Sequence, residues 1–244
     1  MLLSPKDLDQ FQERINYKFL NLNLLKQSLT HRSYLNEKNR DYSINEHNER
    51  LEFLGDAVVE LIVTDYLYKN FSEAEGYLTS LRAALVNYRN MGSIGFEIGL
   101  DKVLLLGRSE QNGSNGDSLP LVANALEALI GAIYLDSGYE SCEIFTKNYL
   151  LKNLPDIIQA GTYRDSKSEF QEVVQKKFKV TPRYNVISSI GKDHEKEFTS
   201  GVYIKDRLIA TGNGRSKQDA ETAAAQLAVK AIYEELNNQQ NTVI

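Results

Sequence analysis

Two stretches of the sequence each place oxygen-bearing side chains one helical turn apart. Glu52 and Asp56 are four residues apart, and Asn124 and Glu127 are three residues apart. Because an α-helix has about 3.6 residues per turn, each pair would share one face of its helix. If the two faces met, they would offer four oxygen ligands. Hard divalent cations such as Mg²⁺ or Mn²⁺ prefer oxygen ligands, so the pattern indicates a site for one of these ions.

An acidic pair at this spacing also occurs on the solvent-exposed face of ordinary amphipathic helices. The flanking residues argue against that interpretation here, because both stretches are largely apolar and leave few solvent-facing positions. Each stretch also contains a glycine, Gly55 or Gly131. Glycine inside a helix costs about 1 kcal/mol relative to alanine. We therefore expect the two glycines to mark a close approach of two helix backbones.

The composition is that of an ordinary globular protein. With 244 residues, 42% hydrophobic and 25% charged, the chain suits one large domain or two smaller ones. Its start lacks a basic segment followed by an apolar run, and we expect no membrane span and a cytoplasmic location. The single cysteine, Cys142, excludes an internal disulfide, and with three scattered histidines it argues against a zinc site.

The net charge of −5 conceals a division along the chain. Residues 1–162 carry 15 Lys and Arg against 22 Asp and Glu, whereas residues 163–244 carry 13 against 11. The first part is therefore acidic and the second weakly basic. Charge alone does not establish nucleic-acid binding.

The hydrophobic pattern predicts an α+β protein with two domains. Up to residue 152 it is helical throughout, with helices expected at 5–13, 22–34, 45–69, 76–99, 118–136 and 139–151. Pro155 and Gly161 indicate a linker over 153–163. A second domain at 164–237 shows an α-β-β-β-α order, with elements at 166–178, 183–190, 196–205, 207–214 and 216–236. Residues 238–244 are expected to form a polar tail.

At this point the sequence resembles bacterial ribonuclease III, the endonuclease that cuts double-stranded RNA. Residues 48–56, Asn-Glu-Arg-Leu-Glu-Phe-Leu-Gly-Asp, match the family signature almost letter for letter. Further blocks at 30–34, 75–79 and 127–132 follow the family order, and the second domain resembles a double-stranded RNA-binding domain. The resemblance covers nearly the whole chain. It implies an all-helical endonuclease domain over 1–152 followed by the RNA-binding domain.

The resemblance also implies roles for individual residues. Asp56 and Glu127 would be catalytic, and Phe53 would plug into a neighbouring subunit of a homodimer. The ligands of the Mg²⁺ cofactor, for which Mn²⁺ could substitute, would be Glu52, Asp56, Asn124 and Glu127. A second layer of acidic side chains would support these ligands, namely Glu49 and Glu75.

One ligand position departs from the family pattern, because Asn124 stands where the family usually has Asp. An amide oxygen can coordinate Mg²⁺ or Mn²⁺, but it brings no formal charge and cannot act as a base. Three explanations are open: a natural variant that remains active, a chain that binds RNA without cutting it, or a deliberate change made to trap a substrate.

Double-stranded RNA presents 2′-hydroxyls in a shallow minor groove and phosphates beside a deep major groove, so a binder needs contacts to both. The first helix of the second domain offers polar side chains on one side, at Ser168, Gln171 and Glu172. The loop after its first strand matches the family's minor-groove loop through His194. A glycine-containing turn then leads into the last helix, whose start offers phosphate contacts from Arg215, Ser216 and Lys217.

These observations predict metal-assisted hydrolysis of double-stranded RNA that leaves 5′-phosphate and 3′-hydroxyl ends. The resemblance implies that the enzyme acts in the processing of rRNA and mRNA precursors. The alternative is a catalytically impaired double-stranded RNA-binding protein, which Asn124 alone supports. A more distant rival is a di-metal hydrolase or phosphatase of small molecules, against which the second domain argues.

Overall fold

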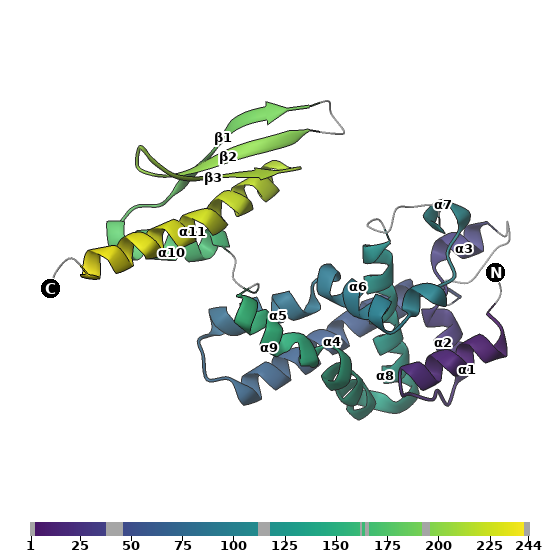
Figure 1. Ribbon diagram of the computed structural model, residues 1–244. Coiled ribbons are helices and arrows are strands. Elements are labelled where there is room, and N and C mark those ends of the chain that lie inside the picture. The colour runs from purple at the N-terminus through teal and green to yellow at the C-terminus, as the bar shows by residue number, and fades with distance from the viewer. Residues whose placement is uncertain are drawn as a thin grey trace. The chain divides into compact units, whose positions relative to one another are not determined.

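The computed structural model describes residues 3–37, 46–111, 118–161, 163, 166–191 and 196–241. The chain divides into two compact units, Met1–Tyr163 and Arg164–Ile244. Among its described residues the first unit has helices and no strand, whereas the second has three strands and two helices (Figure 1). The predicted α+β class is confirmed.

The first unit is built around two long helices, α4 (Glu49–Asn70) and α8 (Leu119–Tyr149), which pack on one another more extensively than any other pair of elements. Both contribute fully buried side chains to one core, among them Ile62, Val63 and Leu129. The remaining elements surround this pair: α1 (Pro5–Arg14), α2 (Leu22–Ser28), α3 (Arg32–Asn36), α5 (Glu75–Val86), α6 (Tyr88–Glu97), η1 (Leu100–Lys102), α7 (Arg108–Gln111), η2 (Leu151–Asn153) and α9 (Leu154–Ala160).

Two of the expected helices are divided in the structure. The helix expected at 76–99 breaks at Asn87, whose side chain accepts hydrogen bonds from the N–H groups of Arg89 and Asn90 and so caps α6. The helix expected at 22–34 breaks before α3, where the N–H of Ser33 donates to His31 Nδ1 at 3.3 Å. Apolar periodicity runs on through such polar caps, and the side chain decides where the next helix begins.

Helix α8 confirms the expected break between 136 and 139. Gly138 has φ 79° and ψ −170°, which is non-helical, and the chain changes direction there. This positive φ is readily adopted only by glycine. Near the kink, Cys142 is buried with its Sγ 3.4 Å from the carbonyl oxygen of Ile130. Burial raises the pKa of the Cys142 thiol to about 12.

The segment Leu119–Ala160 is long and apolar enough to cross a bilayer, which the sequence analysis did not anticipate. Of its most apolar 18-residue window, 56% is buried inside the protein. The core helix of a soluble protein has this same character. The segment is therefore weak evidence for a membrane span.

The segment 153–163 differs from the linker that was expected. Residues Leu154–Ala160 form α9, which packs against α5 and the first core through Leu154, Ile157 and Ile158. These three residues lie at i, i+3 and i+4, the spacing of an apolar helical stripe. Pro155 stands in the first turn of α9, where proline is well tolerated because its missing N–H is not needed. The prediction treated this proline as a loop signal.

In the second unit, α10 (Ser166–Phe178) and α11 (Lys217–Asn241) cover one face of an antiparallel sheet (Figure 1). The strand order is β1 (Arg183–Ile190), β2 (Glu197–Ile204), β3 (Arg207–Gly214). A small separate core includes Phe170, Val174, Val202 and Ile232. Helix α11 continues to Asn241, so the expected polar tail is helical over most of its length.

Asp136 ties the loop before α2 to α8. Its carboxylate accepts hydrogen bonds from the N–H of Leu20 at 2.9 Å, the N–H of Asn21 at 2.8 Å and the hydroxyl of Tyr17 at 2.8 Å. Burial alone would raise the pKa of Asp136, but these hydrogen bonds outweigh it and hold the pKa below the ordinary 3.8. The ionised carboxylate therefore stabilises the fold.

We predict that Asp136→Asn lowers the free energy of unfolding by about 1–3 kcal/mol at pH 7, because two backbone donors lose a charged acceptor. The native pKa lies below the unfolded one, so this stability is present above pH 3.8 and is lost as the pH falls through the native pKa. Denaturant unfolding at neutral pH and near pH 3 measures the difference between the two proteins.

Asp65→Asn is the control, because Asp65 forms an exposed i, i+4 pair with Lys69 at 2.7 Å. Its loss should change stability by less than about 0.5 kcal/mol. Equal effects of the two substitutions at neutral pH would contradict the role given to Asp136.

Candidate catalytic site and RNA-binding face

Helices α4 and α8 touch through their backbones at the two glycines. A β-carbon at Gly55 would lie 1.8 Å from the carbonyl oxygen of Glu127, and one at Gly131 would lie 2.2 Å from the carbonyl oxygen of Leu51. No side chain fits at such distances, so the expected close approach is confirmed. The contact sets the turn that carries Glu52 and Asp56 directly against the turn that carries Glu127.

The carboxylates on these turns act on one another electrostatically. Burial raises the pKa of Glu127 to about 7, and the charges of Asp56 and Glu52 contribute to that rise. Burial likewise raises the pKa of Glu52, followed by the charges of Glu49 and Asp56. Glu52 and Glu127 are half-buried, whereas Glu49 and Asp56 are exposed. The structure thus brings four of the predicted acidic residues into one neighbourhood of concentrated negative charge.

These side chains do not form a closed coordination sphere. Within the described ranges, no three His, Cys, Asp or Glu side chains are grouped so that they could hold a metal ion. The donor chemistry nevertheless fits a hard cation, since the facing turns offer carboxylate oxygens and the amide oxygen of half-buried Asn124. The assignment of these residues as ligands stays a prediction that rests on donor chemistry and on the helix contact.

Glu49 is held at the edge of the acidic turn by two residues that the sequence analysis did not single out. Its carboxylate lies 3.2 Å from Arg32 Nη1, and its N–H donates to Nδ1 of buried His47 at 3.4 Å. Arg32 falls within the 30–34 block, so its position in that block was the available signal. His47 lies just before α4 and carried no pattern of its own.

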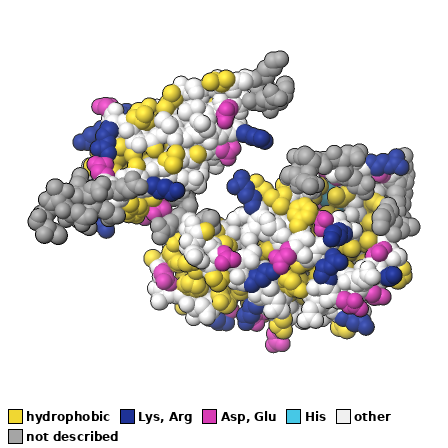
Figure 2. All heavy atoms as spheres, in the orientation of Figure 1, with side chains coloured by type: hydrophobic (Ala, Val, Ile, Leu, Met, Phe, Trp, Pro, Cys, Tyr) yellow, Lys and Arg dark blue, Asp and Glu magenta, His cyan; other side chains and the backbone are white. Residues whose placement is uncertain are grey.

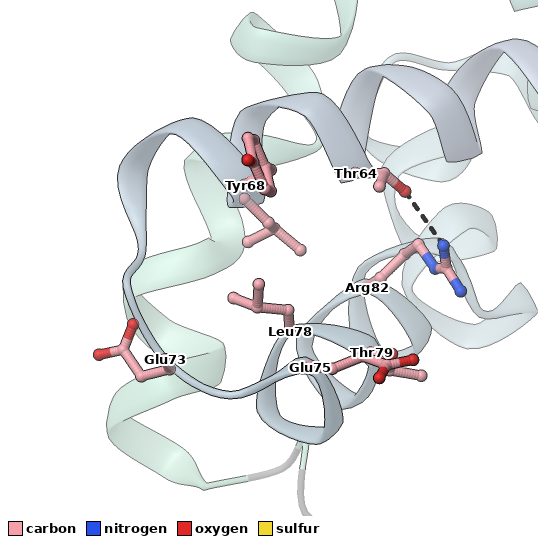
Figure 3. Close-up of a pocket in the computed structure, with 8 residues that line it drawn as sticks. Thr64, Tyr68, Glu73, Glu75, Leu78, Thr79 and Arg82 are labelled. Carbon is pink, nitrogen blue, oxygen red and sulfur yellow. Dashed lines mark hydrogen bonds between the residues drawn. The ribbon is translucent and has the colours of Figure 1, made fainter.

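Glu75 lies in a different place. It begins α5 and lines a cavity of about 460 Å³ between α4 and α5. Figure 3 shows Leu78 of α5 pointing toward the α4 side of this cavity, where Tyr68 lies, and Arg82 donating to Thr64 Oγ1 at 3.1 Å. The α4 residues that line this cavity with Glu75, among them Thr64 and Tyr68, lie two or more helical turns after Asp56. Within one chain, the structure therefore does not bring Glu75 to the acidic turns.

Helix α4 also exposes a hydrophobic stripe beside the acidic turn. Phe53 is 81% exposed, Leu61 58% and Tyr68 77%. These residues recur at i, i+8 and i+15, so they follow one side of the helix. Exposed apolar side chains in a row are typical of interaction surfaces.

In the second unit, the predicted minor-groove residues Ser168, Gln171 and Glu172 are exposed on α10, while Phe170 and Val174 of the same helix are buried in the core. The start of α11 is capped, because the N–H of Asp219 donates to Ser216 Oγ at 3.0 Å. His194 lies outside the described residues. The phosphate contacts expected at this turn are all exposed, namely Arg215, Ser216 and Lys217.

Acidic and basic side chains are interspersed on the visible face of the first unit (Figure 2). That face therefore has no concentrated basic patch among the residues the structure describes. The second unit has the weakly basic charge balance and the exposed polar face, so it is the better candidate for binding a polyanion.

Comparisons with known proteins decide the family. The family model described as "Ribonuclease-III-like" matches residues 21–154, and the one described as "Double-stranded RNA binding motif" matches residues 166–232. "Ribonuclease 3" of Borreliella afzelii is 40% identical over 94% of this chain and 93% of its own. "Ribonuclease 3" of Campylobacter fetus is 43% identical over 89% of this chain and 95% of its own. The chain belongs to the ribonuclease III family.

A solved structure agrees with this assignment. The nuclease domain of the Campylobacter jejuni ribonuclease III aligns with a TM-score of 0.54 at 37% identity, covering 61% of this chain and 99% of that one. The predicted family and enzyme class are therefore confirmed. The chain is an endoribonuclease of a family that uses divalent metal ions, and its second unit carries the double-stranded RNA-binding motif.

We predict that Gly55→Ala lowers the free energy of unfolding by at least about 2 kcal/mol and reduces RNA cleavage, because the new methyl group forces α4 away from Glu127. Thermal melting and cleavage of a long RNA duplex measure the two effects.

Gly76→Ala is the matched control, since a β-carbon at this exposed position of α5 meets nothing within 4 Å. It should be neutral or gain up to about 1 kcal/mol through lower chain entropy in the unfolded state. If Gly55→Ala behaved like Gly76→Ala, the helix contact would not be the constraint described above.

Proposed function

We propose that this protein hydrolyses double-stranded RNA with Mg²⁺, or Mn²⁺ in its place, leaving 5′-phosphate and 3′-hydroxyl ends. The observation that carries the proposal is the contact of Gly55 with the backbone of Glu127, which sets three carboxylates on facing turns. We further propose that the enzyme works in the cytoplasm on rRNA and mRNA precursors, as the family resemblance implies.

The residues that would hold the metal are Glu52, Asp56, Asn124 and Glu127, with Asp56 and Glu127 closest to the chemistry. A bound divalent ion supplies an activated water and stabilises the departing oxygen. With a pKa of about 7, Glu127 retains a proton in a large fraction of molecules at neutral pH. Binding of a cation must displace that proton, so metal affinity should weaken as the pH falls. Asn124 contributes a neutral oxygen, which limits the repulsion among the carboxylates.

The second unit would position the duplex. The face formed by Ser168, Gln171 and Glu172 suits hydrogen bonds to 2′-hydroxyls and base edges in the minor groove. Arg215, Lys217 and the N-terminus of α11 suit a phosphate across the adjacent major groove. His194 is proposed as the minor-groove contact of the loop after β1, on the resemblance alone.

We propose a homodimer joined through α4. The side chain of Phe53 is exposed, and the cavity of about 460 Å³ between α4 and α5 is large enough to receive an aromatic ring. Two copies related by a two-fold axis would each insert this ring into the other. Because Phe53 adjoins Glu52 and Glu75 lines the cavity, the insertion would carry Glu75 toward the acidic turn of the second copy. That arrangement supports a role for Glu75 beside the ligands.

The catalytic proposal predicts cleavage of a long RNA duplex with Mg²⁺ and none with EDTA. Glu127→Gln should slow cleavage by about 100-fold or more, because a metal ligand that contributes several kcal/mol of transition-state stabilisation is lost. Asn124→Asp should speed cleavage, because it restores a charged ligand. Gel analysis of the product ends and single-turnover rates measure these effects.

Duplex binding without cutting at any metal concentration would contradict the nuclease proposal. An unchanged rate for Asn124→Asp would show instead that this position does not limit the reaction.

The dimer proposal predicts that Phe53→Ala weakens self-association by at least about tenfold, because a buried aromatic anchor is removed. Leu78→Trp should act in the same way by filling the cavity. Sedimentation velocity across a dilution series measures the dissociation constant. Leu20→Ala is the control, since Leu20 is 85% exposed but lies away from α4 in the sequence. Equal weakening by the control would refute the assignment of this surface.

A further inference from the structure

One lysine in the second unit joins three elements. Nζ of Lys167 on α10 lies 2.5 Å from Oε2 of Glu221 on α11. The same nitrogen lies 4.9 Å from the centre of the Tyr184 ring on β1, within the range of a cation–π contact. A single side chain therefore links both helices and the sheet.

This pair is better sheltered than an ordinary surface ion pair. The side chain of Lys167 is 33% exposed and that of Glu221 is 25% exposed. Partial burial and the aromatic ring lower the local dielectric, which strengthens the attraction between the two charges. Lys167 also lies three residues before Phe170, which is fully buried in the core. The pair therefore extends the packing of α10 on α11 toward the surface.

The position of the pair is what gives it significance. Lys167 directly precedes Ser168, the first residue of the proposed minor-groove face. Glu221 lies one helical turn after Lys217, about 6 Å along the axis of α11. Lys217 belongs to the proposed phosphate-binding turn, residues 215–217. That turn is fixed on β3, because a β-carbon at Gly214 would lie 2.4 Å from the backbone nitrogen of Ala220. The ion pair thus connects the minor-groove face of α10 to an anchored phosphate-binding turn.

We propose that Lys167 and Glu221 are positioning residues that fix the spacing between the minor-groove face on α10 and the phosphate-binding turn of α11. The inference rests on the proposed RNA face. An A-form duplex presents its grooves at fixed separations, so a binder that holds its two contacts at the matching distance loses less conformational entropy on binding. Neither residue needs to touch RNA for this effect.

The proposal makes a prediction opposite in sign to simple electrostatics. Glu221 places a negative charge near a turn that would face phosphates, so removing that charge should tighten RNA binding if charge were all that mattered. If Glu221 instead positions the helices, removing its charge weakens binding. The two roles are therefore separated by the direction of one measurement.

The experiment uses the full chain and an RNA duplex of about 24 base pairs, longer than the span of one such domain. Affinity is measured in EDTA, well below the melting temperature of each variant. Glu221→Gln and Lys167→Met should each weaken RNA binding about threefold to tenfold. Lys167→Arg keeps the positive charge and should bind RNA as tightly as the unsubstituted protein. In Mg²⁺ the same two variants should raise KM and leave kcat unchanged.

Glu235→Gln is the matched control. It also removes one carboxylate from α11 together with an ion pair, here to Arg207 of β3, but far from the proposed RNA face. It should leave the affinity unchanged. Gln171→Ala tests the RNA face itself and should weaken binding.

If Gln171→Ala weakens binding while Glu221→Gln tightens it or leaves it unchanged, the positioning role is overturned and the RNA face stands. If Lys167→Met weakens binding with a reduced salt dependence while Glu221→Gln tightens it, Lys167 contacts phosphate directly and the proposal is wrong. If Gln171→Ala has no effect, the RNA face fails and the inference fails with it.

Discussion

The close contact between α4 and α8 is the constraint on which the first unit depends. With glycine at positions 55 and 131, the two backbones meet without intervening side chains, and the carbonyl oxygen of Glu127 occupies the space where a β-carbon would stand. At this contact, burial raises the pKa of Glu52 and of Glu127, and the charges of neighbouring carboxylates add to the rise. Packing of the surrounding core stabilises this arrangement against the mutual repulsion of the carboxylates. Repulsion of this kind is expected at a site that binds cations.

The sequence predicted this arrangement because its signals are local. Glycines inside apolar helices have few explanations other than close packing, and acidic residues at i, i+4 must share a face. The break at Gly138 was predictable for the same reason, since apolar periodicity stops and resumes around it. The second unit was predictable from the alternation of helix and strand patterns, with errors confined to the ends of elements such as α11.

Other features depend on tertiary contacts that no short pattern contains. Asn87 could have continued a helix or capped the next one, and only the N–H groups it meets decide between them. Pro155 is typical of a loop in the sequence, and only the packing of the apolar stripe of α9 against α5 shows that it stands in a helix. Glu75 could be assigned to the acidic turns only through the family resemblance, because its own neighbours line a separate cavity. Arg32, which holds Glu49, comes from a segment distant from α4 in the sequence, and His47, just before α4, carried no pattern that marked it.

The buried thiol has a practical consequence. Cys142 is the only cysteine in the chain, and neither its accessibility nor its high pKa favours reaction with alkylating reagents. A cysteine introduced at an exposed site would therefore be the only readily labelled thiol of the native protein. A fluorophore attached there, paired with a dye on the RNA, would follow the movement of either unit during turnover without first removing a natural residue.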